Sequence, residues 1–128
     1  QGTNDDIVDA WNALLVGLDT RSTSWVRTLR DSSRVILLSN INVLHHERIA
    51  KECAELFSLF DAMYLSYEIG MRKPSRDIFE HVLRNEHCVA GDISYFDDSP
   101  QHVIGARSLG IDAHRVVSID DLPSLLGL

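Results

Sequence analysis

Short apolar segments alternate with segments of helical periodicity along most of the chain. Arg34–Ser39 is rich in β-branched residues and has no polar alternation, which is typical of a strand buried on both faces of a parallel sheet. Similar short apolar runs predict strands at Asp61–Ser66, Ile93–Phe96 and Ala113–Val117. Strands that alternate with helices through short connections predict an α/β fold with a parallel sheet.

The segments between these strands carry the spacing of amphipathic helices. Apolar residues predict one helix over Ile49–Phe57, another that opens at Lys73-Pro74-Ser75, and a short last helix over Asp120–Leu126. After the third strand, Ser99 is expected to be an N-cap and Pro100 the first helical residue, where a missing N–H costs nothing.

The first thirty residues differ from the rest because only helices are predicted there. Asp5–Leu18 has its apolar residues at spacings of three and four, which predicts a helix. Thr20 or Ser22 is expected to cap a second helix. We therefore divide the chain into a helical segment, residues 1–30, and an α/β core, residues 31–128.

Composition fits one ordinary domain. The 128 residues are 45% hydrophobic and 24% charged, and they carry a net charge of −7 with a pI near 5.2. An acidic surface repels phosphate backbones, so we expect no nucleic-acid partner. No apolar run approaches the ~18 residues of a membrane span, so we expect no membrane partner. Two cysteines, Cys53 and Cys88, make no disulfide scaffold, which favours a reduced, cytoplasmic protein.

Polar residues follow three of the predicted strands. Ser39 and Asn40 end the first, Lys73 comes shortly after the second, and Asp97 and Asp98 follow the third. In open parallel sheets, ligands bind in the crevice beyond the carboxyl ends of the strands. These five residues are therefore candidates for one site.

Each candidate also has a purely structural interpretation. Asp97 and Asp98 can form an Asx-turn and a helix cap, Ser39 can cap a strand, and Lys73 can be a solvated surface residue. Functionally, two adjacent carboxylates suit Mg²⁺, Ser39 can donate to a phosphate oxygen, and Lys73 can neutralise charge in a transition state. The six histidines show neither triad nor metal-ligand spacing.

Three segments together resemble the motifs of the haloacid dehalogenase (HAD) superfamily of phosphohydrolases. Leu37–His45 is similar to the second motif, Tyr64–Pro74 to the third and Tyr95–Pro100 to the fourth. The resemblance is closest to the sugar-phosphatase branch that includes α-D-glucose-1-phosphate phosphatases. It implies a Rossmann-like core, and it makes Asp5–Leu18 similar to the end of that branch's helical cap, with a linker helix up to residue 30.

The resemblance also implies a mechanism. In this family an aspartate attacks the phosphoryl group of a small phosphorylated metabolite such as a sugar phosphate, Mg²⁺ shields the charge, and water hydrolyses the aspartyl-phosphate. By the same resemblance, Ser39 and Lys73 are the catalytic residues that hold the phosphate, with Asn40 helping. Asp97 and Asp98 serve the Mg²⁺ site.

The family's first motif, an Asp-x-Asp on the central strand, is absent from this sequence. Either the chain is a fragment of a phosphatase, inactive alone, or it is a non-catalytic phosphate-binding module. Its start at Gln1 favours the fragment. The resemblance predicts a gap beside Val35–Ser39 and Ile93–Phe96. We expect the chain's own missing N-terminal segment, a strand-swapped copy, or re-pairing of the flanking strands to fill it.

A receiver-like phosphoacceptor domain is a less favoured alternative. Receivers also gather an acidic pair, a hydroxyl and a lysine around Mg²⁺ at the ends of parallel strands. Their acidic pair comes first in the chain, whereas here the order is Ser39, Lys73, Asp97-Asp98.

Overall fold

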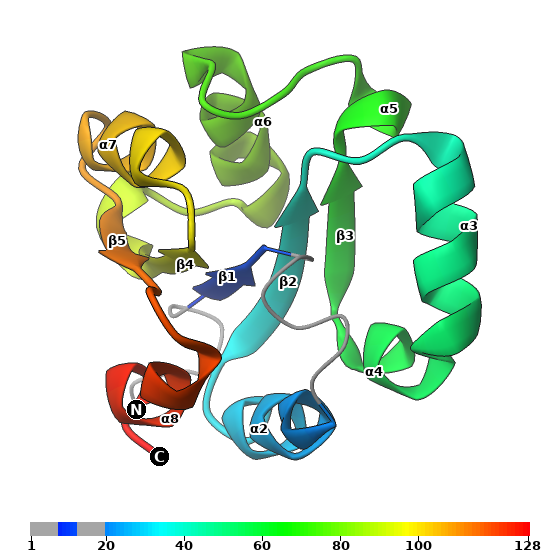
Figure 1. The fold of residues 1–128 in the computed structure, drawn as a ribbon. Coiled ribbons are helices and arrows are strands. Elements are labelled where there is room, and N and C mark those ends of the chain that lie inside the picture. Colours follow the sequence, from blue (N-terminus) through cyan, green and yellow to red (C-terminus); the bar gives the residue numbers. More distant parts are fainter. Residues whose placement is uncertain (1–7, 13–19) are drawn as a thin grey trace.

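Five parallel strands form the centre of the molecule (Figure 1). The computed structural model describes residues 8–12 and 20–128. The strands lie in the order β3-β2-β1-β4-β5, and every neighbouring pair is parallel. Their bounds are β1 Val8–Trp11, β2 Arg34–Ser39, β3 Ala62–Leu65, β4 Ile93–Asp97 and β5 Asp112–Arg115. The predicted α/β fold with a parallel sheet is confirmed.

Helices connect the strands, and most of them lie where the periodicity predicts. Their bounds are α2 Arg21–Leu29, α3 Val43–Glu52, α4 Ala54–Leu59, α5 Ser66–Ile69, α6 Arg76–Glu86, α7 Pro100–Arg107 and α8 Leu122–Leu126, with 3₁₀ turns at Ala90–Asp92 and Ile119–Asp121. The helix expected over Ile49–Phe57 is two helices, because Cys53 leaves helical geometry at φ −121° and ψ 36°. Ser99 is the N-cap residue of α7, but its side chain makes no capping hydrogen bond.

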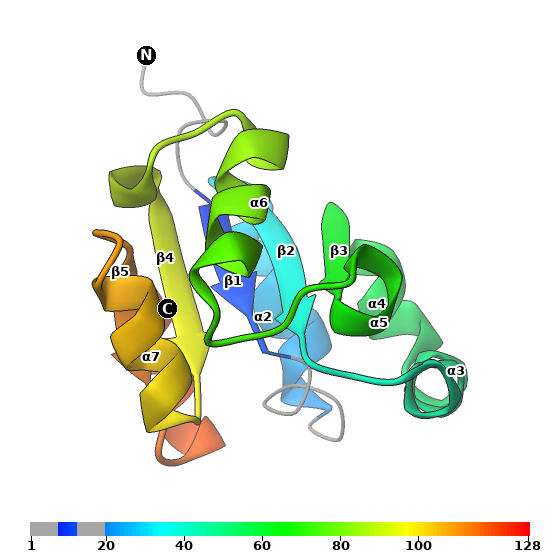
Figure 2. The ribbon, with the colours of Figure 1, turned by 90° about the horizontal axis from the view of Figure 1, so that it is seen from above.

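The helices cover both faces of the sheet, which gives three layers (Figure 2). One apolar core joins the sheet to α2, α3, α4 and α8, and the other joins it to α6 and α7. In the central strands, alternate residues belong to different cores: Val35 and Leu37 pack in the first core, and Ile36 and Leu38 in the second. This explains why β2 has no polar alternation.

The central position of the sheet is not empty. Val8–Trp11 lies there as β1 and pairs with both β2 and β4, with Ala10 opposite Ile36 on one side and Tyr95 on the other. The prediction of a helix over Asp5–Leu18 is therefore wrong for Val8–Trp11, and the remainder of that range lies outside the described residues. No re-pairing of β2 with β4 and no second copy is needed to fill the gap.

Backbone pairing explains why the tertiary structure overrides the helical pattern here. Two central strands without a partner would leave several buried N–H and C=O groups unbonded, each at a cost of about 1–3 kcal/mol. β1 satisfies them, and all four of its residues are buried. This strand also buries two polar groups at a cost in free energy. The Asp9 side chain is only 6% exposed, and the indole N–H of Trp11 is buried without a partner among the described residues.

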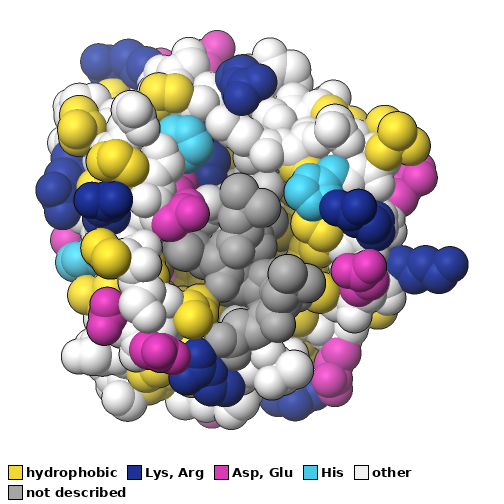
Figure 3. Space-filling model, viewed as in Figure 1, with side chains coloured by type: hydrophobic (Ala, Val, Ile, Leu, Met, Phe, Trp, Pro, Cys, Tyr) yellow, Lys and Arg dark blue, Asp and Glu magenta, His cyan; other side chains and the backbone are white. Residues whose placement is uncertain are grey.

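An ion pair lies at the start of β2. The Glu86 carboxylate, 1% exposed at the end of α6, accepts from Arg34 Nε at 2.5 Å and from the Tyr64 hydroxyl at 2.5 Å. Cys53 and Cys88 are half-buried and form no disulfide within the described part of the chain. In the described part of the chain, none of the helices has the length and apolar character to cross a membrane. Basic and acidic side chains are interspersed on the face drawn in Figure 3.

Candidate functional site

The sheet brings Lys73 and Asp97 together. The Lys73 ammonium lies 2.8 Å from Asp97 Oδ2 and also donates to the Leu38 carbonyl at 3.1 Å. Both side chains of the pair are 0% exposed. Lys73 is therefore a buried ion-pair partner, and the interpretation of it as a solvated surface lysine is wrong.

The Asp97 carboxylate accepts hydrogen bonds from several further groups. Beyond Lys73, the donors are the Tyr95 hydroxyl, His102 Nδ1 at 3.0 Å from Oδ2, and Asn12 Nδ2 and the Ser99 amide at 3.1 and 2.9 Å from Oδ1. We call Asn12, Lys73, Tyr95, Asp97 and His102 the buried polar cluster. Protein groups therefore satisfy the hydrogen-bonding capacity of the Asp97 carboxylate.

Burial and the neighbouring charges shift the pKa values of Asp97, Lys73 and Tyr95. Burial alone would raise the pKa of Asp97, but the Lys73 ammonium and the hydrogen bonds to it hold that pKa well below its usual value. Burial lowers the pKa of Lys73, and the facing Asp97 carboxylate works in the opposite direction. Burial and the Asp97 charge raise the pKa of Tyr95. At neutral pH the Asp97 carboxylate is therefore ionised, and Tyr95 keeps its proton as a donor.

Two contacts position Lys73. The Asn40 side chain exchanges two hydrogen bonds with the Lys73 backbone: Nδ2 donates to its carbonyl at 2.9 Å, and Oδ1 accepts from its amide at 2.8 Å. On the other side, Gly105 of α7 approaches Pro74 so closely that a Cβ at Gly105 would lie 3.0 Å from the Pro74 carbonyl oxygen. The backbone at Lys73 and Pro74 is thus held between the end of β2 and α7.

The hydrogen bonds of Asp97 and Asp98 show how far each carboxylate is available to bind Mg²⁺. Asp97 already accepts five hydrogen bonds, whereas Asp98 is exposed and its Oδ1 accepts from Asn12 Nδ2 at 3.1 Å. Among the described residues, no group of three or more His, Cys, Asp or Glu side chains is placed to hold a metal. The donor set fits Mg²⁺ only in part: the exposed Asp98 carboxylate has free oxygen lone pairs, whereas the Asn12 amide donates to both carboxylates.

The other predicted residues lie close by. Ser39 is 1% exposed at the end of β2 and makes no hydrogen bond with Lys73 or Asp97. Asn40 directs its amide to the Lys73 backbone.

Sequence reasoning missed Tyr95, His102 and Asn12. Tyr95 could have been found, because residues two apart on a strand share a face and Asp97 lies two positions on. His102 lies in the first turn of the helix that follows Asp97, where a side chain can fold back towards the strand end. Asn12 carried no such signal, because the periodicity assigned its segment to a helix.

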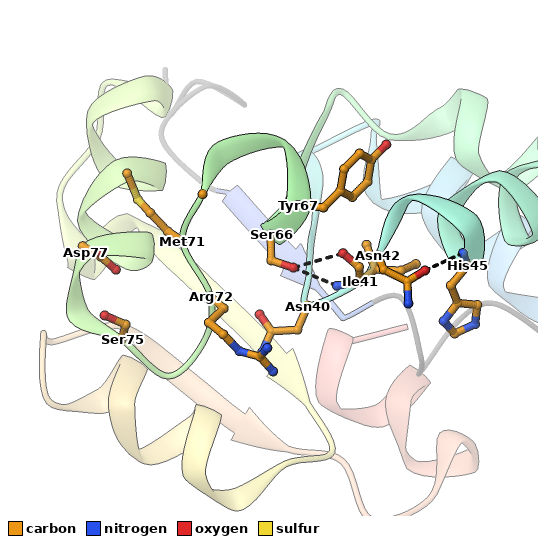
Figure 4. Close-up of a pocket in the computed structure, with 11 residues that line it drawn as sticks. Asn40, Ile41, Asn42, His45, Ser66, Tyr67, Met71, Arg72, Ser75 and Asp77 are labelled. Atoms are coloured by element: carbon orange, nitrogen blue, oxygen red, sulfur yellow. Dashed lines mark hydrogen bonds between the residues drawn. The ribbon is translucent and has the colours of Figure 1, made fainter.

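An open cavity of about 680 Å³ adjoins this cluster (Figure 4). We call it the Arg72 pocket; its lining residues are Asn40, Ile41, Asn42, His45, Ser66, Tyr67, Gly70, Met71, Arg72, Ser75 and Asp77. Ser66 Oγ fixes one wall, because it accepts from the Ile41 amide at 2.9 Å and donates to the Ile41 carbonyl at 3.1 Å. Figure 4 shows Ser75 and Asp77 on one side of Arg72, and Asn42 and His45 on the other.

Comparison with known proteins finds relatives that are phosphatases. The chain is 27% identical over 118 residues to a D-ribitol-5-phosphate phosphatase of Bacteroides thetaiotaomicron, covering 88% of this chain and 57% of the relative. It is 32% identical over 94 residues to a sesquiterpene phosphatase of Aspergillus oryzae, covering 73% of this chain and 47% of the relative. The chain thus spans about half the length of these curated relatives.

A solved structure shares the fold and the family. It is a HAD family enzyme of Bacteroides thetaiotaomicron in complex with magnesium and inorganic phosphate; the TM-score is 0.69 and the identity 28%, covering 76% of this chain and 52% of the other. The family model for haloacid dehalogenase-like hydrolases matches residues 40–116, more than half of the chain. The resemblance predicted from the three motifs is confirmed: the chain belongs to the haloacid dehalogenase-like hydrolase family.

Proposed function

We propose that the protein is a magnesium-dependent phosphohydrolase for a small phosphorylated metabolite, and that Ser39, Asn40 and Lys73 form its phosphate site. The observation that carries the proposal is the buried Lys73–Asp97 ion pair at 2.8 Å, at the carboxyl ends of parallel strands in a member of this family. A lysine ammonium at the strand ends is suited to neutralise a phosphate in a transition state.

In this proposal each residue of the site has its own role. Lys73 supplies positive charge and Asp97 keeps it protonated, while the Asn40 clasp holds the lysine in place. Asp98, with Asp97 beside it, would hold Mg²⁺ once the Asn12 amide moves away. When bound, that ion shields the charge of the phosphate.

Asn12 favours a second candidate function, that of a non-catalytic phosphate-binding module. It follows the central strand and donates to both acidic residues, but an amide is no nucleophile for phosphoryl transfer. The sequence also contains no Asp-x-Asp. We therefore propose that the 128-residue chain binds phosphate without hydrolysing it, and that turnover needs a carboxylate which this chain does not supply.

Calorimetric titration of the 128-residue chain with inorganic phosphate, with and without Mg²⁺, tests the phosphate site. We expect saturable 1:1 binding that Mg²⁺ strengthens. Lys73→Met should abolish it, whereas Lys51→Met, the same change at the chain's other lysine on the exposed side of α3, should not. Ser39→Ala should weaken it several-fold while leaving a buried ion pair intact.

Two results would contradict the proposal. One is the absence of phosphate binding to the folded chain at millimolar phosphate. The other is binding that Ser39→Ala and a folded Lys73→Met variant leave unchanged. Hydrolysis of p-nitrophenyl phosphate by the chain alone would refute the narrower claim that it lacks a nucleophile.

A further inference from the structure

We infer that Tyr95 is a positioning residue of the phosphate site: its hydroxyl holds the Asp97 carboxylate when the Lys73 ammonium turns from Asp97 towards a phosphate. The inference rests on the proposed function, because it takes Lys73 to bind the phosphate. It assigns a role to a side chain that does not itself touch the ligand.

Lys73 is closed off from any ligand in the position described. Its side chain is 0% exposed, and Nζ donates to the Leu38 carbonyl at 3.1 Å and to Asp97 Oδ2 at 2.8 Å. A phosphate therefore reaches Nζ only after a movement, and the simplest is a rotation of the lysine away from Asp97. Lysine is suited to this, because its ammonium has three N–H donors on a flexible stem.

The Asp97 carboxylate has more donors than it needs. Five groups donate to it: Lys73, Tyr95 and His102 to Oδ2, and Asn12 and the Ser99 amide to Oδ1. The two oxygens of a carboxylate offer about four lone-pair positions. If the lysine turns away, four donors remain, and the buried carboxylate keeps its hydrogen bonds.

Tyr95 is the donor whose loss would matter most for this movement. Its hydroxyl shares Oδ2 with Lys73, and Nζ lies 5.6 Å from the centre of its ring. Tyr95 is 1% exposed, so water has little access to take its place. Without the hydroxyl, a lysine that turns away would leave Oδ2 with His102 alone. The carboxylate would then retain Lys73 more strongly, because an unsatisfied buried acceptor is costly, and phosphate would bind more weakly.

The Arg34–Glu86 ion pair makes the same tyrosine contact without this reserve. Glu86 accepts from Arg34 Nε and Nη2 and from the Tyr64 hydroxyl. In the described part of the chain, Tyr64 would be its one remaining donor if the arginine left. This pair takes no part in the proposed phosphate site, so Tyr64→Phe is a matched control for Tyr95→Phe.

The experiment measures two quantities for each variant of the 128-residue chain: the Kd of inorganic phosphate by calorimetric titration, and the free energy of unfolding by urea denaturation. Tyr95→Phe removes the hydroxyl and keeps the ring, and we expect it to raise the Kd by about fivefold. Tyr64→Phe should also lower the stability of the fold but leave the Kd unchanged.

Lys73 itself can be observed directly, because Lys51 and Lys73 are the only lysines of the sequence. In the parent labelled with ¹⁵N-lysine, phosphate should shift the NMR signal of the Lys73 ammonium and not that of Lys51. The same shift should need more phosphate in Tyr95→Phe. If Tyr95→Phe does not fold, His102→Ala replaces it, since His102 is the other donor to Oδ2 and its side chain is 19% exposed; it should raise the Kd as well.

The outcomes separate this inference from the proposed function. An unchanged or lower Kd in the folded Tyr95→Phe variant, or in His102→Ala where that variant replaces it, would overturn the inference while phosphate binding stands. Equal rises of the Kd in Tyr95→Phe and Tyr64→Phe would also overturn it, because they would follow from lost stability alone. If inorganic phosphate does not bind to the parent chain, the proposed function fails first and the inference fails with it.

Discussion

The buried polar cluster and the Arg72 pocket lie side by side but hold their polar groups in opposite ways. In the cluster, Lys73 and Asp97 are closed off from water and each charge is compensated by protein groups. In the pocket, Arg72 and Asp77 are exposed and have no partner among the described residues. Charged side chains are therefore compensated by protein groups in one region and, within the described part of the chain, have no protein partner in the other.

This difference indicates which substitutions should change the stability of the fold and which should change ligand binding. Removing one member of a buried pair leaves an uncompensated charge, which costs far more than losing an exposed one. Substitutions in the cluster should thus change folding first, and substitutions in the pocket should change binding alone. Three predictions test that contrast and a fourth, at Asp9, tests a buried carboxyl group of β1; they are given in order of decreasing effect.

Asp97→Asn should have the largest effect, because it leaves the Lys73 ammonium buried without its counter-ion. We expect the free energy of unfolding to fall by about 3–5 kcal/mol, measured by urea denaturation at pH 7. Asp121→Asn makes the same change at an exposed position and should stay within about 0.5 kcal/mol of the parent. Equal effects of the two variants would mean that the ion pair does not form.

Gly105→Ala should disturb the clasp around Lys73 without touching a charge. Its Cβ would meet the Pro74 carbonyl oxygen at 3.0 Å, so α7 or the loop must move. We expect about 1–2 kcal/mol of destabilisation and a changed NMR shift at the Lys73 amide, because overpacking strains the site. Gly91→Ala, where nothing lies within 4 Å, is the matched control. If both variants behave alike, the close approach is absent.

Asp9→Asn should raise the free energy of unfolding at neutral pH, because the amide has no charge to bury. Burial raises the pKa of Asp9, and its hydrogen bond to the Ser33 side chain works in the opposite direction. Between the unfolded and the folded pKa of Asp9, the folded chain therefore holds a proton that the unfolded chain has lost. This contribution is complete below about pH 4 and is lost as the pH rises through the folded pKa.

Unfolding curves of the parent and Asp9→Asn should thus converge below about pH 4 and separate towards pH 7. Stability from Asp97 runs the other way: its lowered pKa contributes above about pH 4, and the contribution is lost as the pH falls towards the folded pKa. A parent that is more stable than Asp9→Asn at pH 7 would place Asp9 in water rather than in the sheet.

Arg72→Met should have the smallest effect on stability, within about 0.5 kcal/mol, because the guanidinium is exposed. Thermal unfolding would measure it beside Arg48→Met, the same change at an exposed arginine of α3 outside the pocket. A loss of more than about 1 kcal/mol would show that Arg72 supports the fold, and the contrast between the two regions would then be weaker than we describe.

The sequence predicted the regular elements of the core because their patterns are local. β2 begins and ends at the predicted residues, and Lys73 and Asp97 come together as parallel-strand topology requires. The place of Val8–Trp11 could not be predicted, since its apolar spacing is that of a helix and only the unpaired edges of β2 and β4 favour a strand there. The Arg72 pocket arises from loops whose approach no local pattern encodes.

The most direct test of the account concerns β1, because its position brings Asn12 to the buried polar cluster. Interstrand contacts measured by NMR on the 128-residue chain would decide it. The account predicts nuclear Overhauser contacts from the backbone of Ala10 to both Ile36 and Tyr95, its register partners. Helical contacts between residues three apart in Val8–Trp11, with no contact from Ala10 to either strand, would contradict it.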